Sequence, residues 1–125
     1  MENILSRTNM EENMQLKLLI SQLKETASKE KSALWKRIAE DLEKPARQRR
    51  IVNISKLNRI TKPNEIVVVP GKVLGDGDLN HKLTIAAFNF SKNAVEKMKK
   101  QNCDLMTISG LIKKNPKAKD VRIIG

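Results

Sequence analysis

A strongly basic segment divides this chain into two parts with different hydrophobic patterns. Residues 44–64 carry seven Lys or Arg side chains and no Asp or Glu. Apolar residues recur at helical spacing before this segment, whereas β-branched runs bounded by Gly, Pro and Asp follow it. The net charge is −1 over residues 1–43 and +12 over residues 44–125, which together give +11. N-terminal helices and a later strand-containing region are therefore expected on either side of a segment that favours a polyanionic partner.

The length of 125 residues suits one domain with one hydrophobic core, and the 39% hydrophobic content supports a folded chain. The chain has no apolar run of about 18 residues, and its N-terminus lacks the pattern of a signal peptide. The protein is expected to remain in the compartment where it is made. Cys103 is the only cysteine. It therefore cannot form an internal disulfide, and it is interpreted as a small buried apolar side chain.

Two helices are predicted before the basic segment. The first covers residues 11–27, and the second begins near Ser28 as N-cap and ends before Pro45, because the residue before proline avoids helical backbone angles. Their apolar stripes consist of Leu16, Leu19, Ile20, Leu23 and Ala27 in the first helix and Trp35, Ile38, Ala39 and Leu42 in the second.

Residues 65–125 are expected to contain short strands and helices. The predicted strands lie around residues 66–70, 73–74, 83–87, 103–106 and 121–124, and the predicted helices begin at Ser91 and Thr107. Asp76 and Gly77 predict a turn with positive φ that joins neighbouring strands as a hairpin.

The basic segment itself shows neither the period of a strand nor that of a helix. We interpret it as an extended arm that docks partly on the domain and partly on a partner, and that is mobile until the partner binds. A solvated loop with incidental charge is the alternative.

Nucleic acid is the favoured partner. Helices that bind membrane surfaces usually carry aromatic and leucine side chains on an apolar face, but this segment has no aromatic residue and contains Pro45 and Pro63. The whole chain has only one Trp, two Phe and no Tyr, so base stacking on an aromatic sheet is not expected. The mode of nucleic-acid binding that remains is recognition of the phosphate backbone by Lys and Arg.

The motif PGKVLGDGD does not match a phosphate-binding P-loop or a calcium-binding EF-hand, because the required second glycine, hydroxyl residue and closing glutamate are absent. A tight turn is expected, in which the backbone at Gly71 can approach a phosphate closely. His81 is the only histidine, so a metal site is not expected there. A phosphate or sugar contact by His81 and Lys82 and an exposed histidine without a role are both possible interpretations.

Four blocks of sequence then resemble a known family. They are LWKRIAE (34–40), EKPARQRRIVNISKLNR (43–59), VVVPGKVLGDGDLNHKLTIAAFNFS (67–91) and NPKAKDVRIIG (115–125). Together they are similar to large-subunit ribosomal protein eighteen-e of archaea and eukaryotes, especially its short archaeal form, a family related to bacterial large-subunit protein fifteen. The likeness runs from about Thr8 to Gly125. The chain departs from the family pattern at Met10, Ile60 and Gly110, where family members tend to have a proline, an aromatic and an acidic residue.

The resemblance implies an α/β fold, with N-terminal helices (1–43), a basic RNA-binding arm (44–64) and a small core of irregular β-β-α units (65–125). It implies a structural component of the large, 50S-type ribosomal subunit in the cytoplasm, with 23S-type ribosomal RNA and neighbouring ribosomal proteins as partners. No cofactor, metal, membrane, small-molecule substrate or catalytic residue is expected. The positions carried over as RNA-facing are Lys44, Arg47, Arg49, Arg50, Asn53, Lys56 and Arg59 in the arm and Gly71, Lys72, His81 and Lys82 in the loop block, and the charge of the arm adds Lys62.

Two other functions remain open from the residues alone. An architectural DNA-binding or chromatin protein would share the basic charge. An enzyme acting on nucleic acid would need a catalytic cluster that the sequence does not show.

Overall fold

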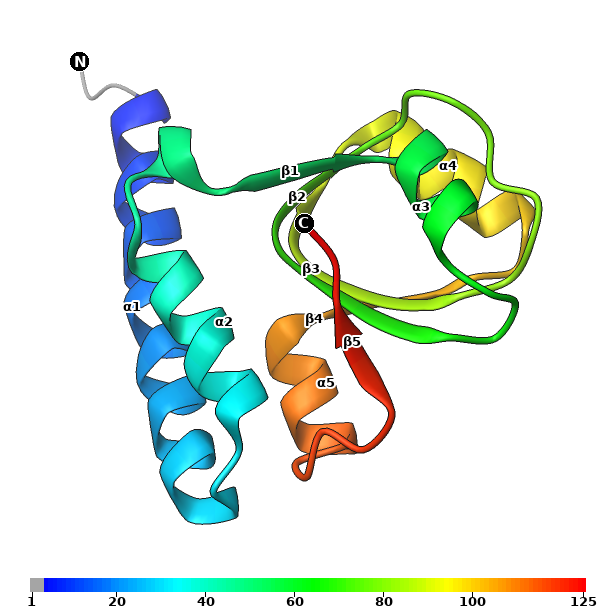
Figure 1. Ribbon diagram of the computed structural model, residues 1–125. Coiled ribbons are helices and arrows are strands. Elements are labelled where there is room, and N and C mark those ends of the chain that lie inside the picture. The colour runs from blue at the N-terminus through cyan, green and yellow to red at the C-terminus, as the bar shows by residue number, and fades with distance from the viewer. Residues whose placement is uncertain (1–3) are drawn as a thin grey trace.

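The computed structural model describes residues 4–125, apart from the side chains of residues 4–12 and of Ala46. Residues 1–3 of the expected helical region therefore lie outside the described residues. The chain forms a mixed α/β fold, in which two N-terminal helices precede a small domain with a parallel sheet (Figure 1). This architecture confirms the expected fold class. None of the described helices is long and apolar enough to cross a membrane.

The two N-terminal helices are α1 (Ile4–Glu30) and α2 (Ala33–Glu43). The expected N-cap at Ser28 is wrong, because α1 continues through this residue. Helix α1 also begins well before residue 11, the expected start of the first helix. The chain reverses at Lys31, whose φ of 53° is left-handed, and Ser32 caps α2 by accepting a hydrogen bond from the N–H of Trp35 at 3.4 Å. The expected end before Pro45 is confirmed, since Lys44 already has an extended backbone with ψ of 152°.

Five parallel strands form the sheet. They are β1 (Arg50–Asn53), β2 (Ile66–Leu74), β3 (Thr84–Phe90), β4 (Asp104–Thr107) and β5 (Val121–Ile123). The order is β1-β2-β3-β4, and β5 also pairs with β2. Strand β3 pairs along nearly the whole length of one edge of β2. The opposite edge of β2 is shared by two strands, with β5 beside residues 66–68 and β1 beside residues 71–74.

The strands β2 and β3 do not form the expected hairpin. Gly77 has the predicted positive φ, at 94°, but residues 75–83 run back along the sheet, so that Ile66 pairs with Thr84 and the two strands are parallel. The reason is that this loop is held by other elements: the N–H of Ser55 donates to the carbonyl of Asp76 at 3.0 Å, and the ammonium of Lys97 donates to the carbonyl of Gly75 at 2.8 Å. The predicted turn is therefore correct, but the strand pairing is wrong.

Three short helices complete the fold: α3 (Ile54–Ile60), α4 (Lys92–Lys100) and α5 (Ile108–Lys114). The predicted cap at Ser91 is confirmed, and the helix predicted from Thr107 has this residue as its N-cap. Ser91 Oγ accepts from the N–H of Ala94 at 3.2 Å, and Thr107 Oγ1 accepts from the N–H of Gly110 at 3.0 Å. The strand before α5 and the strand after it also lie where the sequence predicts them.

The sheet is buried on both faces, as is usual for parallel strands. Val67, Val69 and Ile85 belong to a core with side chains of α3 and α4, whereas Val68 and Ala86 belong to a core with side chains of α1, α2 and α5. The apolar stripes predicted for the first two helices lie in this second core, with Leu23, Trp35, Ile38 and Leu42 fully buried.

The expectation of an extended arm at residues 44–64 is wrong. This segment forms the 3-10 turn η1 (Ala46–Gln48), strand β1 and helix α3, and Val52, Ile54 and Leu57 are fully buried. Elements of four and seven residues are too short to show a period, and their folding depends on the tertiary contacts of these three apolar side chains. The basic segment is thus part of the folded domain.

Replacement of Trp35 tests the second core. Trp35 is fully buried, and its Nε1–H donates to the carbonyl of Pro116 at 2.7 Å. Trp35→Ala should lower the free energy of unfolding by roughly 3 to 5 kcal/mol, measured by urea or thermal denaturation. Glu40→Ala, on the exposed side of the same helix, is the control and should unfold nearly as the wild type. Equal stability of the two variants would contradict the assigned core.

Candidate nucleic-acid interface

The basic segment presents its exposed cations from short, rigid elements. Arg47 lies on η1, Arg59 on α3 and Lys62 just after α3, and all three side chains are exposed. The side chain of Lys56, also on α3, is half-buried and donates to the main-chain oxygen of Gly125 at 3.1 Å. Arg47, Arg59 and Lys62 are therefore the cations of this segment with the freest access to an external anion.

Asp41 holds two of the predicted RNA-facing cations. Its carboxylate oxygens lie 3.1 Å from Lys44 Nζ and 3.1 Å from Arg50 Nε, and the Asp41 side chain is only 8% exposed. Arg50 is itself 24% exposed, so this ion pair is well shielded from water. Asp41 thus ties the end of α2 to the start of β1, and it partly neutralises Lys44 and Arg50.

Arg49 packs on an aromatic ring. Its guanidinium carbon lies 5.9 Å from the centroid of Phe88, and its Nε–H donates to the carbonyl of Lys44 at 3.2 Å. The guanidinium is therefore oriented in advance, and the side chain is only half-buried. Asn53 occupies the N-cap position of α3, although its side chain makes no capping hydrogen bond there.

Gly71 has a structural role that the sequence analysis did not identify. It pairs with Arg50 in the β1–β2 register and is buried, and a Cβ atom at this position would overlap the carbonyl oxygen of Arg50. The glycine permits close approach of β1 to β2. The neighbouring Lys72 is exposed and pairs with the exposed Ile51 on β1.

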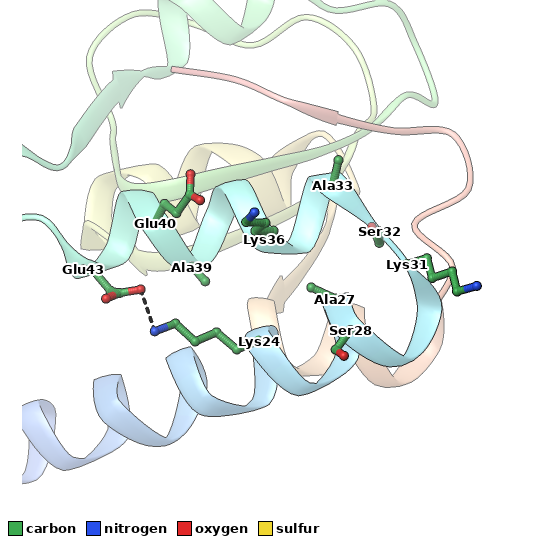
Figure 2. Close-up of a pocket in the computed structure, with 10 residues that line it drawn as sticks. All are labelled: Lys24, Ala27, Ser28, Lys31, Ser32, Ala33, Lys36, Ala39, Glu40 and Glu43. Atoms are coloured by element: carbon green, nitrogen blue, oxygen red, sulfur yellow. Dashed lines mark ion pairs between the residues drawn. The ribbon is translucent and has the colours of Figure 1, made fainter.

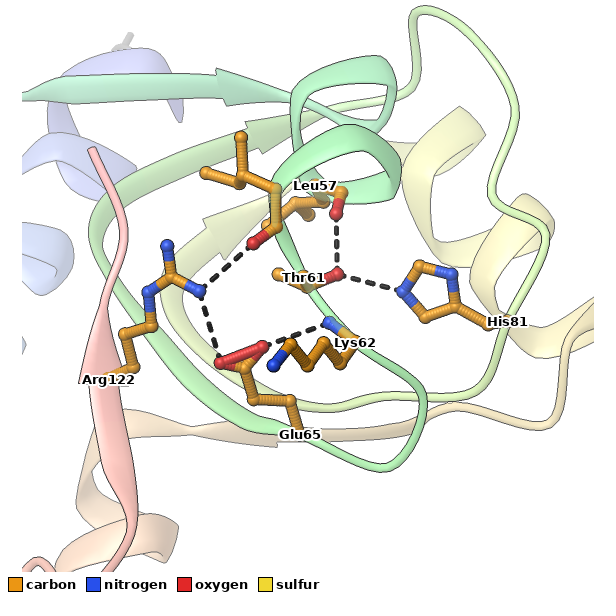
Figure 3. A network of polar contacts seen from close by, with 7 residues as sticks. Leu57, Thr61, Lys62, Glu65, His81 and Arg122 are labelled. Atoms are coloured by element: carbon orange, nitrogen blue, oxygen red, sulfur yellow. Dashed lines mark hydrogen bonds and ion pairs between the residues drawn. The ribbon is translucent and has the colours of Figure 1, made fainter.

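The loop block brings His81 and Lys82 next to the end of the basic segment (Figure 3). His81 Nε2 lies 2.8 Å from the hydroxyl oxygen of Thr61, and the carbonyl of Lys82 accepts from the N–H of Asn64 at 2.7 Å. Thr61 also donates to the carbonyl of Leu57, so its oxygen is free to accept from Nε2–H of His81. Lys82 is exposed and His81 is half-buried. These contacts bring together three predicted positions, Lys62, His81 and Lys82. Lys72 lies on β2 and Lys44 at the end of α2.

Several residues that hold this arrangement were not predicted. Arg122 Nη1 donates to the carbonyl of Ile60 at 2.9 Å and to the Glu65 carboxylate at 3.2 Å, and Figure 3 shows the Arg122–Glu65 pair. The N–H of Asn80 donates to Asn58 Oδ1 at 2.9 Å. Each contact joins residues at least 22 positions apart in sequence. Local patterns could not have revealed them.

The pKa shifts in this region fit structural roles. The N–H of Lys62 donates to the Glu65 carboxylate at 3.0 Å and is the main cause that lowers the pKa of Glu65. Arg122 also lowers this pKa, whereas burial raises it. Burial raises the pKa of the Cys103 thiol, which packs against the core of α3 and α4. Within residues 4–125 as described, no cluster of three or more His, Cys, Asp or Glu side chains is placed to hold a metal ion.

Comparison with known proteins gives a family match. Residues 2–125 match the sequence profile described as "Ribosomal protein 60S L18 and 50S L18e". The chain is 45% identical over 107 residues to "Large ribosomal subunit protein eL18" of Sulfurisphaera tokodaii, which covers 86% of this chain and 91% of that protein. It is 41% identical over 112 residues to the protein of the same name in Methanothermobacter thermautotrophicus, which covers 90% and 93% of the two chains. The protein of the same name in Methanoregula boonei is 42% identical over 120 residues, which are 96% of this chain and 99% of that protein.

Gly71→Ala tests the close approach of β1 to β2. The added methyl group overlaps the carbonyl of Arg50, so the strands must separate. We expect a loss of about 1 to 3 kcal/mol in the free energy of unfolding, measured by chemical denaturation. The control is Gly110→Ala in α5, where the new Cβ would lie 3.2 Å from its nearest neighbour, Thr107 Oγ1, and where little change is expected. A Gly71→Ala protein as stable as the wild type would contradict this role.

Glu65→Gln tests the pH dependence. The folded state holds the pKa of Glu65 below its usual value of 4.5, so the carboxylate stabilises the fold fully above this pH. The stabilisation is lost as the pH falls through the lowered pKa, because the unfolded chain takes up the proton first. The melting temperature of the wild type should exceed that of Glu65→Gln at neutral pH, and the difference should shrink below pH 4.5.

Arg122→Gln is the companion variant, since it removes the cation and keeps the carboxyl group. In the Arg122→Gln background, the further change Glu65→Gln should lower the melting temperature at neutral pH by less than it does in the wild type. A wild-type advantage over Glu65→Gln that stays constant down to strongly acidic pH would show that Glu65 does not act through its charge.

Proposed function

The chain belongs to the family of ribosomal proteins 60S L18 and 50S L18e, and on this premise we propose that it binds and stabilises folded 23S-type ribosomal RNA through its basic segment and the adjoining loop. As a member of this family, the protein is a structural constituent of the large ribosomal subunit, located in the cytoplasmic ribosome. It is not an enzyme.

The observation that supports RNA binding is the group of exposed cations beside one another at the end of α3. Arg59 and Lys62 come from the basic segment and Lys82 from the loop block, and the 2.8 Å contact between His81 and Thr61 fixes the loop against the segment. The cations project from folded backbone rather than from a flexible arm. Little conformational entropy is then lost when they meet phosphates.

This arrangement supports recognition of RNA shape and phosphate positions rather than of base identity. Arginine can bind a phosphate through two parallel N–H donors, whereas lysine contributes a point charge. Lys44 and Arg50, which Asp41 partly neutralises, would orient the segment and contribute less to binding. The remaining predicted positions, Arg49, Asn53, Lys56, Gly71 and Lys72, complete the proposed interface.

Three narrower statements belong to the same proposal. Residues 1–125 would act as one domain, neighbouring large-subunit proteins would contact it, and the family would be related to bacterial large-subunit protein fifteen. The alternative of an architectural DNA-binding protein has no support among the relatives, whose names are those of ribosomal proteins.

Salt dependence of RNA binding tests the proposal. The variant Arg47→Gln, Arg59→Gln, Lys62→Gln removes three exposed charges and no ion pair present among the described residues. Binding to an archaeal 23S-type RNA transcript should weaken steeply with salt, and the variant should reduce the magnitude of the log–log slope by about 2 to 3 if each side chain neutralises one phosphate. The slope is measured by filter binding at several salt concentrations.

The matched control is Lys92→Gln, Lys99→Gln, Lys100→Gln, which removes three exposed lysines from α4. It should change the slope much less. Equal binding of duplex DNA and ribosomal RNA, or a wild-type protein without salt-dependent binding, would overturn the proposal.

A further inference from the structure

A second group of basic side chains lies at the other end of α2. The sequence KEKSALWKR around the α1–α2 turn carries four cations and one acid, and residues 113–122 carry five cations and one acid. All nine cations are exposed, and Lys114 and Arg122 form ion pairs with Asp104 and Glu65. The other seven, which we call the turn surface, are Lys29, Lys31, Lys36, Arg37, Lys113, Lys117 and Lys119. The near-neutral total charge of residues 1–43 conceals the first part of this group.

Tertiary contacts hold the two parts of the turn surface together. Trp35 Nε1–H at the start of α2 donates to the carbonyl of Pro116 at 2.7 Å, and Ala118 packs against the core that contains Trp35. The turn after α5 is itself closed by Asn115, whose side chain donates to the carbonyl of Lys119 at 2.9 Å and accepts from its N–H at 3.2 Å. Lys117 and Lys119 are therefore held on a fixed turn that contacts Trp35, the residue before Lys36.

The charges of the turn surface are not used within the fold. Among the described residues, the ion pairs of this region are Lys24 with Glu43 at 3.0 Å, Lys114 with Asp104 at 3.4 Å and Arg122 with Glu65 at 3.2 Å. None of them involves a member of the turn surface. Figure 2 shows the Lys24–Glu43 pair in the groove between α1 and α2, which is also lined by Lys31 and Lys36. These cations are available to an external anion.

The start of α2 lies at a distance from the end of this helix, where the basic segment begins, although Arg122 contacts Ile60 of that segment. The eleven residues of α2 lie between Ser32 and Lys44. At a rise of 1.5 Å per residue they span about 16 Å. This distance exceeds the screening length of about 8 Å at physiological ionic strength. A phosphate group bound at the start of α2 is therefore largely screened from Lys44.

We propose that the turn surface binds a second segment of RNA, so that the protein links two segments through opposite ends of α2. This inference rests on the proposed function and adds a site to it. RNA phosphate is favoured over an acidic protein because the turn surface is lysine-rich and holds no large exposed apolar side chain. The large exposed apolar side chains of the described chain are Met14, Leu18 and Ile51, which lie elsewhere.

Footprinting with the full chain tests the second site. Hydroxyl-radical cleavage of an archaeal 23S-type RNA transcript should show two protected segments with the wild-type protein. The variant Lys36→Gln, Lys117→Gln, Lys119→Gln should lose protection of one segment, and the variant of Arg47, Arg59 and Lys62 should lose protection of the other. Each triple change should also lower the magnitude of the salt slope by about 2 to 3. All the substituted side chains are exposed, and circular dichroism verifies that the variants fold.

The α4 triple variant distinguishes a site from general attraction. If removal of Lys92, Lys99 and Lys100 weakens binding as much as the turn-surface variant does, only the overall charge matters and the second site is refuted. A single protected segment, or two segments that both survive the turn-surface changes, also refutes it while the proposed function stands. A wild-type protein that protects no RNA would overturn both.

Discussion

Two strands from distant parts of the chain pair end to end along one edge of β2. The end of β5 approaches the start of β1 there, and the side chain of Arg50 lies directly against Gly125. Pro70 has no N–H to offer to a neighbouring strand, and Gly71 allows the backbone of Arg50 to come close. The pairing of β1 fixes the direction in which α3 begins, and therefore the positions of the exposed cations on and after α3.

The few acidic side chains act as anchors in this basic chain. Asp41 holds Lys44 and Arg50, Glu65 holds Arg122, and Asp104 holds Lys114. Exposed pairs such as Asp104 with Lys114 contribute little to stability, typically about 0 to 1 kcal/mol. The shielded carboxylate of Asp41 matters more, because it joins α2 to β1 where the two halves of the chain meet. Among the described residues, Arg47, Arg59 and Lys62 are exposed cations without an ion pair, and the repulsion among such cations would be relieved by a bound polyanion.

Elements with their own local signals could be predicted from the sequence. The stripe containing Trp35, the cap at Ser91, the stop before Pro45 and the strand and helix around Thr107 are all examples. The predictions that failed concern tertiary structure. Ser28 has the chemistry of an N-cap but lies within α1, because the left-handed turn at Lys31 decides where the chain reverses.

The candidate interface shows the same limit. The charge of residues 44–64 was evident, but β1 and α3 were not, because Val52, Ile54 and Leu57 are buried only by elements far away in sequence. Lys44 and Arg50 looked equivalent to Arg47 until the fold brought Asp41 beside them. The cluster at the α1–α2 turn was hidden since its two parts lie about eighty residues apart and meet through the Trp35–Pro116 contact.

The shared edge of β2 also constrains the order in which the protein can be completed during synthesis. Residues 66–68 of β2 pair with β3 on one edge, but they gain their second partner only when residues 121–123 of β5 have left the ribosome. Until then one edge of the N-terminal part of this strongly apolar strand has unpaired N–H and C=O groups, which are open to pairing with another chain. A nascent chain of this protein therefore exposes this edge of β2 until residues 121–123 have emerged and paired.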